Sequence, residues 1–277
     1  MYKIRQAKLA DMKFLIEMSE QEGWMPGIYD AEKFFAADNN GFFIGELNNT
    51  PVACISAVKH GDYGVIGFYV VKKELRGQGF GTKLWQHALD YLGDINIGLD
   101  GVFEQVENYK KSGFKIAHSN ARYFGKFKPS KIDESNIITA DKVNFEDLCK
   151  YDKLHFGSSR KNFLKEWINK EKGFSVCHFE NETIKGFATC RETSSGFRIG
   201  PLFAENKYIA ENLLLHLASK IGDNGLYLDI NEDLKAAVEL VEKLQMKKIC
   251  ELKRMYTKAQ PQAKWDEIFG ITSFELG

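Results

Sequence analysis

The stretch from Gly67 to Thr82 holds the residues whose types and spacing point most directly to chemistry. It reads Gly-Phe-Tyr-Val-Val-Lys-Lys-Glu-Leu-Arg-Gly-Gln-Gly-Phe-Gly-Thr, an apolar strand pattern that leads into glycines and then into a helix pattern. Glycines let the main chain approach a ligand without interference from Cβ atoms, and free N–H groups at a helix start favour a phosphate or pyrophosphate. Arg76 adds a positive charge at the same place. The stretch therefore predicts an anion-binding loop.

Two nucleotide-binding patterns do not fit this loop. A Walker A loop, GxxxxGK[ST], needs its lysine before the Ser or Thr, whereas here Thr82 precedes Lys83. A dinucleotide fingerprint needs GxGxxG, but Gly77, Gly79 and Gly81 give GxGxG, with Thr82 in the position of the last glycine. A purely structural glycine turn remains the alternative to a phosphate site.

The elements that position the loop can be read on either side of it. Three short apolar runs, joined by turns, predict an antiparallel meander of strands at residues 41–47, 52–58 and 65–71. Apolar residues at helical spacing then predict a helix from Gly81 to Leu92, and residues 95–99 read as a strand. A strand, a helix and a returning strand predict a right-handed crossover.

The chain is interpreted as two copies of one plan, which makes it a mixed α/β protein of two domains. The polar stretch Pro129–Ser135 reads as a linker, so the domains are expected at residues 1–128 and 129–277. Chance likeness between two ordinary α+β halves is the alternative. The recurring features lie about 129 to 133 residues apart: Gly41-Phe42 with Gly173-Phe174, Gly67 with Gly200, Leu99-Asp100 with Leu228-Asp229, and Arg122-Tyr123 with Arg254-Met-Tyr256.

Two motifs resemble those of the GCN5-related N-acetyltransferases. Arg76-Gly-Gln-Gly-Phe-Gly81 looks like the family's Arg/Gln-x-x-Gly-x-Gly/Ala coenzyme A loop, and Tyr109, four residues before Gly113-Phe114, is similar to its second signature. Asn108 departs from the leucine often found before that tyrosine. The whole chain looks like a two-domain bacterial branch of the family, through Glu22–Gly27, Arg198–Ala204, Arg254–Tyr256 and Thr272–Gly277.

The resemblance implies two tandem domains, each with a central mixed β-sheet flanked by helices, of which the first binds acetyl-CoA (coenzyme A). The main chain of Tyr69, Val70 and Val71 is expected along the pantetheine, because a strand edge that splays from its neighbour offers unpaired N–H and C=O groups. A backbone N–H of Val70 or Val71 would polarise the thioester carbonyl. The pyrophosphate is expected on the loop residues Arg76, Gly77, Gln78, Gly79, Phe80, Gly81 and Thr82.

The amine that attacks the thioester must be neutral, so some group has to remove its proton. Glu22 is the expected base, since Glu22–Gly27 resembles the family's acceptor-binding wall; an exposed helix-end glutamate is the alternative. Three further candidates are His60, which we expect to be solvated in a turn, Asp62 and Glu104.

Tyr109 is expected to protonate the departing thiolate, and an aromatic packed beneath the cofactor is the alternative. Trp24, Met25 and Tyr29 are expected to form an apolar acceptor wall, unless they are only the loop's own core contacts.

The second half lacks the glycine loop. Residues 201–208 read Pro-Leu-Phe-Ala-Glu-Asn-Lys-Tyr, and Glu205 near the helix start would compete with a phosphate. We therefore expect a degenerate domain that shapes the acceptor site or joins the halves. Residues 265–274 are expected to close the sheet or pack across the interface.

The composition indicates which classes of partner are not expected. Basic and acidic residues number 38 each, which argues against nucleic-acid binding. The five cysteines form no CxxC pair and the histidines no HExxH, so neither a disulfide framework nor a metal site is expected. Without a signal peptide or a long apolar run, the protein is expected to be cytoplasmic and away from membranes.

The expected function is transfer of an acetyl group from acetyl-CoA to an amine, by direct attack in a ternary complex. The alternatives are a non-catalytic acyl-CoA-binding regulatory module and a transferase that uses another acyl-CoA donor. The acceptor is expected to be a small-molecule or peptide amine. No pattern identifies it, and none indicates an oligomeric state.

Overall fold

The computed structural model describes residues 1–126, 132–169 and 173–277. The expected boundary between residues 128 and 129 lies outside these ranges, as does the first part of the expected linker. Within the same ranges, no helix has the length and apolar character needed to cross a bilayer.

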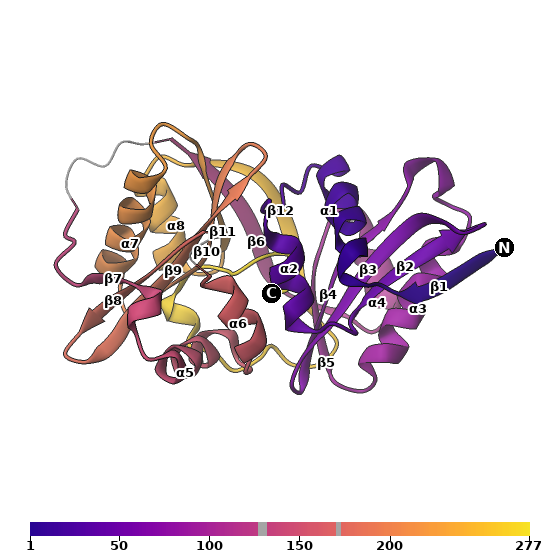
Figure 1. Cartoon of the computed structure of the whole chain (residues 1–277), viewed down its shortest axis with the longest axis horizontal. Helices are drawn as coiled ribbons and strands as arrows, with labels where there is room; N and C mark the ends of the chain where they lie inside the picture. The colour runs from indigo at the N-terminus through magenta and orange to yellow at the C-terminus, as the bar shows by residue number, and fades with distance from the viewer. Residues whose placement is uncertain (127–131, 170–172) are drawn as a thin grey trace.

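One mixed sheet runs through both halves of the chain (Figure 1). The first half supplies β1 (Tyr2–Gln6), β2 (Phe42–Leu47), β3 (Thr50–His60), β4 (Tyr63–Val71), β5 (Asn96–Gly101) and β6 (Lys115–Gly125). The second half supplies β7 (Ile137–Thr139), β8 (Phe174–Glu180), β9 (Thr183–Thr193), β10 (Gly196–Ala204), β11 (Leu226–Asn231), β12 (Lys247–Tyr256) and β13 (Ile268–Gly270). The strand order is β1-β2-β3-β4-β5-β12-β6-β11-β10-β9-β8-β7, and β13 pairs with β10.

Helices cover both faces of this sheet. Successive residues of a strand point to opposite faces, so each strand supplies side chains to two cores. Ile44 and Cys54 pack in a core with α1 and α2, whereas their neighbours Phe43 and Ala53 pack in another core with α3. The mixed α/β fold class is confirmed. The helices are α1 (Met12–Gln21), α2 (Asp30–Ala37), α3 (Phe80–Leu92), α4 (Val106–Lys111), α5 (Phe145–Phe156), α6 (Lys161–Trp167), α7 (Lys207–Lys220) and α8 (Lys235–Lys243).

The two halves exchange a strand at the centre of the sheet. β12 from the second half lies between β5 and β6, and β6 from the first half lies between β12 and β11 (Figure 1). The central sheets expected for two separate domains are therefore joined into one. β12 pairs with β5 of the first half and β6 pairs with β11 of the second, so each half supplies main-chain hydrogen bonds to a strand of the other.

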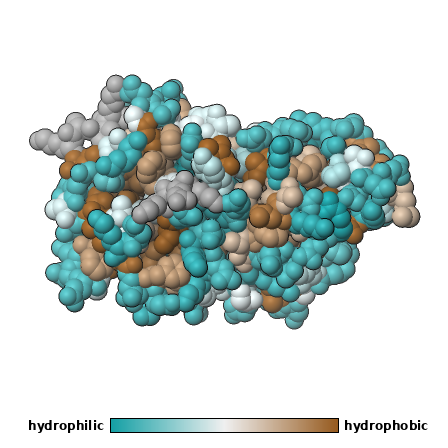
Figure 2. All heavy atoms as spheres, in the orientation of Figure 1, coloured by the Kyte–Doolittle hydropathy of each residue, from teal (hydrophilic) through white to brown (hydrophobic). Residues whose placement is uncertain are grey.

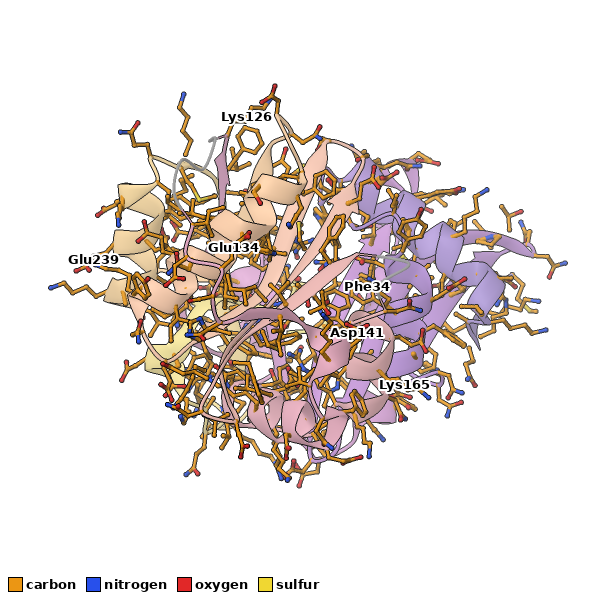
Figure 3. The ribbon with its side chains drawn as sticks, turned by 60° about the vertical axis from the view of Figure 1, so that its left-hand side comes forward. Phe34, Lys126, Glu134, Asp141, Lys165 and Glu239 are labelled. Carbon is orange, nitrogen blue, oxygen red and sulfur yellow. The ribbon has the colours of Figure 1, made fainter. Side chains whose placement is uncertain are left out.

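The elements around the glycine loop match the sequence expectation. β2, β3 and β4 form an antiparallel meander, while β4 and β5 run parallel with α3 between them in the chain. α6 packs against the first half, where Trp167 stacks on Phe34 of α2 at a ring-centroid distance of 5.9 Å. Figure 3 labels Phe34 and, on α6, Lys165. The face of the molecule seen in Figure 2 is mainly hydrophilic, with apolar residues between the polar ones.

The expectation that His60 is solvated is wrong. Its side chain is buried, with the ring against Phe156 of α5 at 4.9 Å, and its backbone carbonyl accepts a hydrogen bond from Ser158. Burial lowers the pKa of His60 to about 3, so the ring is neutral at physiological pH. The sequence of the first half could not show this, because the second half supplies the cover.

Candidate active site

β4 and β5 separate at the point where the sequence places the cofactor. They pair in parallel only from Tyr63 to Ile66 on β4. Beyond that point Val70 and Val71 keep their partners on β3 but have no strand partner on the β5 side in the described chain. One extra residue in β4, with Phe68 at φ 46°, makes a bulge there. The main chain of residues 69–71 thus faces an open gap between two strands, which we call the first gap.

The glycine loop follows directly and is open to solvent. Gly77 and Gly79 have φ of +76° and +80°, a region that favours glycine, and no atom lies within 4 Å of the place where a Cβ would stand on either residue. Gly79 is the N-cap of α3, a helix of 13 residues. The first N–H groups of α3 have no partner within the helix, so they are available to an anion.

Arg76 and Glu22 join the loop to the end of α1. Arg76 donates from Nε to the carbonyl of Val71 at 2.9 Å and from Nη2 to Glu22 Oε1 at 2.7 Å. The side chains are 45% and 22% exposed, so Glu22 is a half-buried helix-end residue with a partner. Lys73 lies 4.0 Å from the same carboxylate. Glu22, the base expected from the sequence, therefore lies beside the glycine loop.

Tyr109 belongs to an aromatic cluster at the mouth of the first gap. Its ring lies 5.3 Å from Trp85 of α3 and 6.4 Å from Phe114, and Trp85 in turn lies 5.4 Å from Tyr69. Burial raises the pKa of the Tyr109 phenol, and the nearby Tyr69 adds to the effect. No hydrogen bond to the Tyr109 hydroxyl occurs among the described residues. Both roles foreseen for it, proton donor and packing aromatic, fit this position.

The acceptor wall foreseen at Trp24, Met25 and Tyr29 is only partly assembled. The Trp24 carbonyl accepts a hydrogen bond of 2.7 Å from Arg122, and Ser195 donates to Met25 Sδ at 3.2 Å. These contacts come from the central strand β6 and from the second half. Tyr29 is 46% exposed and has neither a hydrogen bond nor a ring contact among the described residues.

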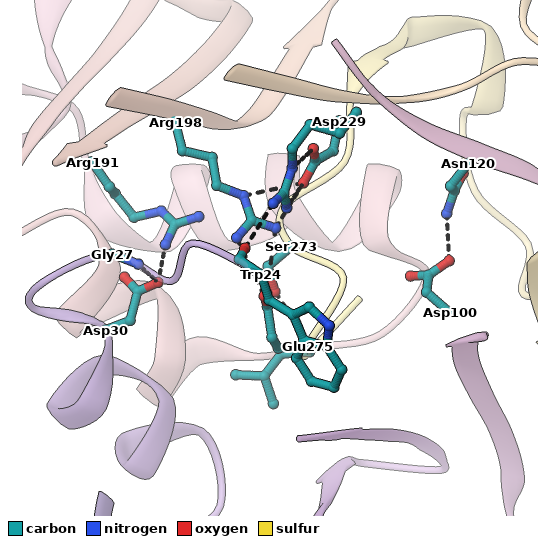
Figure 4. Close-up of polar contacts among 12 residues, drawn as sticks. Trp24, Gly27, Asp30, Asp100, Asn120, Arg191, Arg198, Asp229, Ser273 and Glu275 are labelled. Carbon is teal, nitrogen blue, oxygen red and sulfur yellow. Dashed lines mark hydrogen bonds and ion pairs between the residues drawn. The ribbon is translucent and has the colours of Figure 1, made fainter. Parts of the chain in front are cut away.

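The second half holds the segment that follows Met25 in place. Gly27 forms a β-bridge with Thr193 of β9, and its N–H donates to Asp30 at 2.8 Å. Asp30 in turn pairs with the buried Arg191 (Figure 4). The segment between α1 and α2 is therefore shaped by both halves.

A buried polar network, not foreseen as a functional feature, lies at the centre of the sheet (Figure 4). Asp229 of β11 accepts from Arg122 of β6 at 2.7 and 2.9 Å and from Arg198 of β10 at 2.7 Å. Asp100 of β5 pairs with Arg254 of β12. Burial acts to raise the pKa of Asp229, but the two arginines outweigh it and hold the pKa at about 2. The repeated features of the sequence therefore pair between the halves. Arg122 of the first half binds Asp229 of the second, and Arg254 of the second half binds Asp100 of the first.

The second half has a corresponding gap, but its own chain fills it. β10 pairs with β11 only from Phe197 to Ile199, and β13 then pairs with β10 at Leu202 and Phe203. The N–H of Ile271 donates to the Asp229 carbonyl at 2.8 Å, so the insert reaches β11 as well. The expectation that residues 265–274 close the sheet is confirmed. Pantetheine has no open strand edge there.

The segment after β13 continues to the first gap. The backbone of Glu275 lies against Gly67, where any Cβ would overlap its carbonyl, and Gly277 lies near Val65 and Arg254. The Glu275 side chain accepts from Arg198 at 3.3 Å. In Figure 1 the C-terminus accordingly lies near the middle of the molecule. Residues 273–277 therefore line the inner, closed end of the first gap.

Comparisons with known proteins agree with this geometry. A family model described as acetyltransferase (GNAT) family matches residues 9–114, and one described as acetyltransferase (GNAT) domain matches residues 148–270. Holothin acyltransferase of Pseudoalteromonas sp. (strain SANK 73390) is 32% identical over 278 residues, which cover 98% of this chain and 93% of that protein. The uncharacterized N-acetyltransferase YitH of Bacillus subtilis is 24% identical and aligns over 74% of each chain.

Solved structures share the fold. A putative acetyltransferase from Pyrococcus horikoshii superposes with a TM-score of 0.86 at 24% identity, covering 100% of this chain and 96% of that chain. A tandem GNAT protein from the clavulanic acid biosynthesis pathway gives a TM-score of 0.61 at 10% identity, covering 94% of this chain and 100% of that chain. With two family domains and an acyltransferase relative aligned along nearly the whole chain, this protein belongs to the GCN5-related N-acetyltransferase family and is an acyltransferase.

Proposed function

We propose that the protein is an N-acetyltransferase that moves the acetyl group of acetyl-CoA directly to an amine acceptor in a ternary complex. The observation that carries this proposal is the first gap, with its free strand edge at residues 69–71 and the open glycine loop at the start of α3. An extended chain of amides and a diphosphate are the two parts of coenzyme A that such surfaces suit.

The chain's own groups would divide the binding as follows. Main-chain groups of Tyr69, Val70 and Val71 would pair with the pantetheine amides, because no β5 residue pairs with β4 beyond Ile66; the Val71 carbonyl already accepts from Arg76. The loop from Arg76 to Thr82 would hold the pyrophosphate through its N–H groups and the arginine charge. A backbone N–H at Val70 or Val71 would then polarise the thioester carbonyl.

The chemical step needs two proton transfers. The amine nitrogen attacks the thioester carbon, the C–S bond breaks, the amine gives up a proton and the thiolate gains one. We assign the first transfer to Glu22, directly or through water, and the second to Tyr109. Because burial raises its pKa, Tyr109 keeps its proton throughout the neutral range, as a general acid must.

The two halves would divide the work. Residues 1–128 would bind the donor and carry the reacting groups, and residues 129–277 would form a degenerate copy that fixes the acceptor wall. The filled gap between β10 and β11 supports this division, as do the contacts of Thr193 and Ser195 with the segment after α1.

Holothin is the first acceptor to test, because holothin acyltransferase aligns with nearly the whole chain. Small-molecule amines and peptide amines follow it. That relative is named for acyl transfer in general, so a donor other than acetyl-CoA is the second candidate, and the same gap would serve its coenzyme A portion.

The test is release of free thiol from acetyl-CoA, and from longer acyl-CoA donors, with holothin and a panel of amines. We expect amine-dependent release in the wild type and loss of release in G79E, which places a strained side chain and a negative charge at the N-cap of α3. G222E is the matched control, because Gly222 also has positive φ and open surroundings but lies in the second half. Equal activity of G79E and G222E would contradict the assignment of the loop.

A further inference from the structure

Asp229 binds two arginines that share their surroundings but differ in one contact. Arg122 of β6 and Arg198 of β10 are both buried, and both guanidinium groups lie over the ring of Phe274, at 4.9 and 5.6 Å from its centroid. The remaining amino group of Arg122 donates to the backbone carbonyl of Trp24 at 2.7 Å, whereas Arg198 has no hydrogen bond to residues 22–29 in the described chain (Figure 4). Of the two, Arg122 is the one that connects the central network to the segment after α1.

This contact reaches a segment with an unusual backbone. Gly23 and Met25, on either side of Trp24, have φ of +77° and +52°. A residue other than glycine adopts positive φ at a cost in free energy, and it stays there when its surroundings fix it. The N–H of Trp24 donates to the Ser19 carbonyl of α1 at 3.0 Å, and the carbonyl of Trp24 accepts from Arg122. The helix end thus fixes one side of the Trp24 backbone, and Arg122 fixes the other.

The geometry of Arg122 makes this a strong contact. Its Nε and Nη2 form two parallel hydrogen bonds with Asp229, at 2.7 and 2.9 Å, which orient the planar guanidinium and leave Nη1 for the Trp24 carbonyl. The side chains of Arg122 and Asp229 are 3% and 1% exposed, so water competes little for them. One hydrogen bond from a charged donor corresponds to about 10- to 150-fold in an equilibrium constant. A lysine in this place keeps the charge for Asp229 but lacks the planar fork that makes all three bonds.

We propose that Arg122 is a positioning residue for the acceptor. Through the Trp24 carbonyl it holds the proposed acceptor wall at Trp24 and Met25 in the conformation that binds the amine, and Asp229 of the second half holds Arg122. The inference rests on the proposed function and deepens it, because it names the side chain through which the second half acts on the amine site.

The donor side does not depend on this contact. Glu22 pairs with Arg76 of the glycine loop. The helix that carries Glu22 ends with a backbone bond of its own, from the Gly23 N–H to the Glu20 carbonyl at 2.9 Å. Loss of the bond from Arg122 should therefore lower the fraction of molecules whose wall fits the amine and leave coenzyme A binding unchanged. The apparent affinity for the amine falls by the same fraction.

The first test compares R122K with R198K in the thiol-release assay, with holothin as the acceptor or, if holothin is not acetylated, with the most active amine of the panel. We expect R122K to raise KM for the amine about tenfold or more and to leave KM for acetyl-CoA within about twofold of the wild type. R198K is the matched control, because it alters the same buried cluster beside Phe274 but breaks no bond to Trp24. A purely stabilising role of the arginines would give the two variants the same KM values.

S195A keeps the proposal testable if R122K does not fold. Ser195 is exposed, and its hydroxyl donates to Met25 Sδ at 3.2 Å, so S195A removes a weak contact of the same wall without touching the core. With Arg122 in place, S195A should raise KM for the amine by less than about threefold. A rise as large as the one expected for R122K would assign the wall to Ser195 and overturn the proposal.

The second test needs no turnover. In crystals of R122K the Trp24 carbonyl should turn away from β6 and Met25 should leave positive φ, while residues 69–82 keep their wild-type backbone. Crystals of R198K should keep both features. A wild-type conformation of residues 23–26 in R122K, or an R122K variant with the amine KM of R198K, would overturn the proposal. Absence of thiol release with every amine would contradict the proposed function instead, and the crystals would then decide alone whether Arg122 holds the segment.

Discussion

Replacement of Glu22 by glutamine separates two roles that we assign to one carboxylate, ion-pair partner of Arg76 and proposed base. Glu22 Oε1 accepts a 2.7 Å charged hydrogen bond from Arg76, the arginine of the glycine loop. An ion pair with side chains 22% and 45% exposed is worth about 0.2–1 kcal/mol. In the wild type, Glu22 and the proposed pyrophosphate compete for the charge of Arg76. E22Q removes the carboxylate, so Arg76 is free to bind the pyrophosphate. Coenzyme A should then bind about 1.4-fold to fivefold more tightly.

The same change should slow the reaction. If Glu22 takes the proton of the amine, its loss should lower kcat by about 10²- to 10⁴-fold, the range for a general base. Calorimetric titration with coenzyme A gives the first quantity, and thiol release at saturating acceptor gives the second. E20Q is the control, because Glu20 is exposed near the end of the same helix and has no ion-pair partner among the described residues.

Tighter binding together with slower turnover is the expected signature. An E22Q variant with the kcat of E20Q would remove Glu22 as the base. Unchanged or weaker coenzyme A binding would refute the competition for Arg76. The gain in affinity should also shrink at high salt, because screening weakens the exposed pair in the wild type.

Three further predictions concern the acid, the central network and the buried histidines. Y109F should lower kcat by about 10²- to 10⁴-fold with little change in KM for acetyl-CoA; an unchanged kcat in thiol release would leave Tyr109 a packing residue. D229N removes the negative charge that two buried arginines bind, so it should lower the free energy of unfolding in urea by about 3–5 kcal/mol. A decrease below about 1 kcal/mol would refute the importance of the network for stability. His60 and His118 have folded pKa values of about 3, below the unfolded value near 6.5. The contribution of the two neutral rings to the free energy of unfolding is therefore full above pH 6.5 and is lost as pH falls toward 3, at up to about 2.8 kcal/mol per pH unit for both together. Urea unfolding at pH 7 and pH 5.5 would measure the loss. An H60F/H118F double variant should show a smaller difference between the two pH values.

Local patterns predicted the elements that build the cofactor side. The meander, the helix after Gly81 and the glycine loop all follow from residues close together in the chain, and the structure has β4, Gly79 and α3 where those patterns indicate. The gap between β4 and β5 was expected from the family resemblance and is present as the loss of pairing after Ile66.

Pairing between residues far apart in the chain could not be predicted from the sequence in the same way. The spacing of Asp100 and Asp229 showed a repeat, but nothing local indicates that each aspartate pairs with the arginine of the opposite half, since this follows from the exchange of β6 and β12. The burial of His60 has the same cause, because its cover comes from α5 and the residues just after it. Residues 265–274 were expected to close the sheet, but the place where β13 enters, between β10 and β11, depends on a register that a sequence pattern does not fix.

A crystal structure of the protein with acetyl-CoA bound would test the central claim most directly. We predict one molecule per chain, with its pantetheine along residues 69–71, its pyrophosphate on the N–H groups of Gly77 to Thr82 and its thioester facing the segment 273–277. A pyrophosphate bound elsewhere, a vacant first gap at saturating ligand, or a molecule between β10 and β11 would contradict the account.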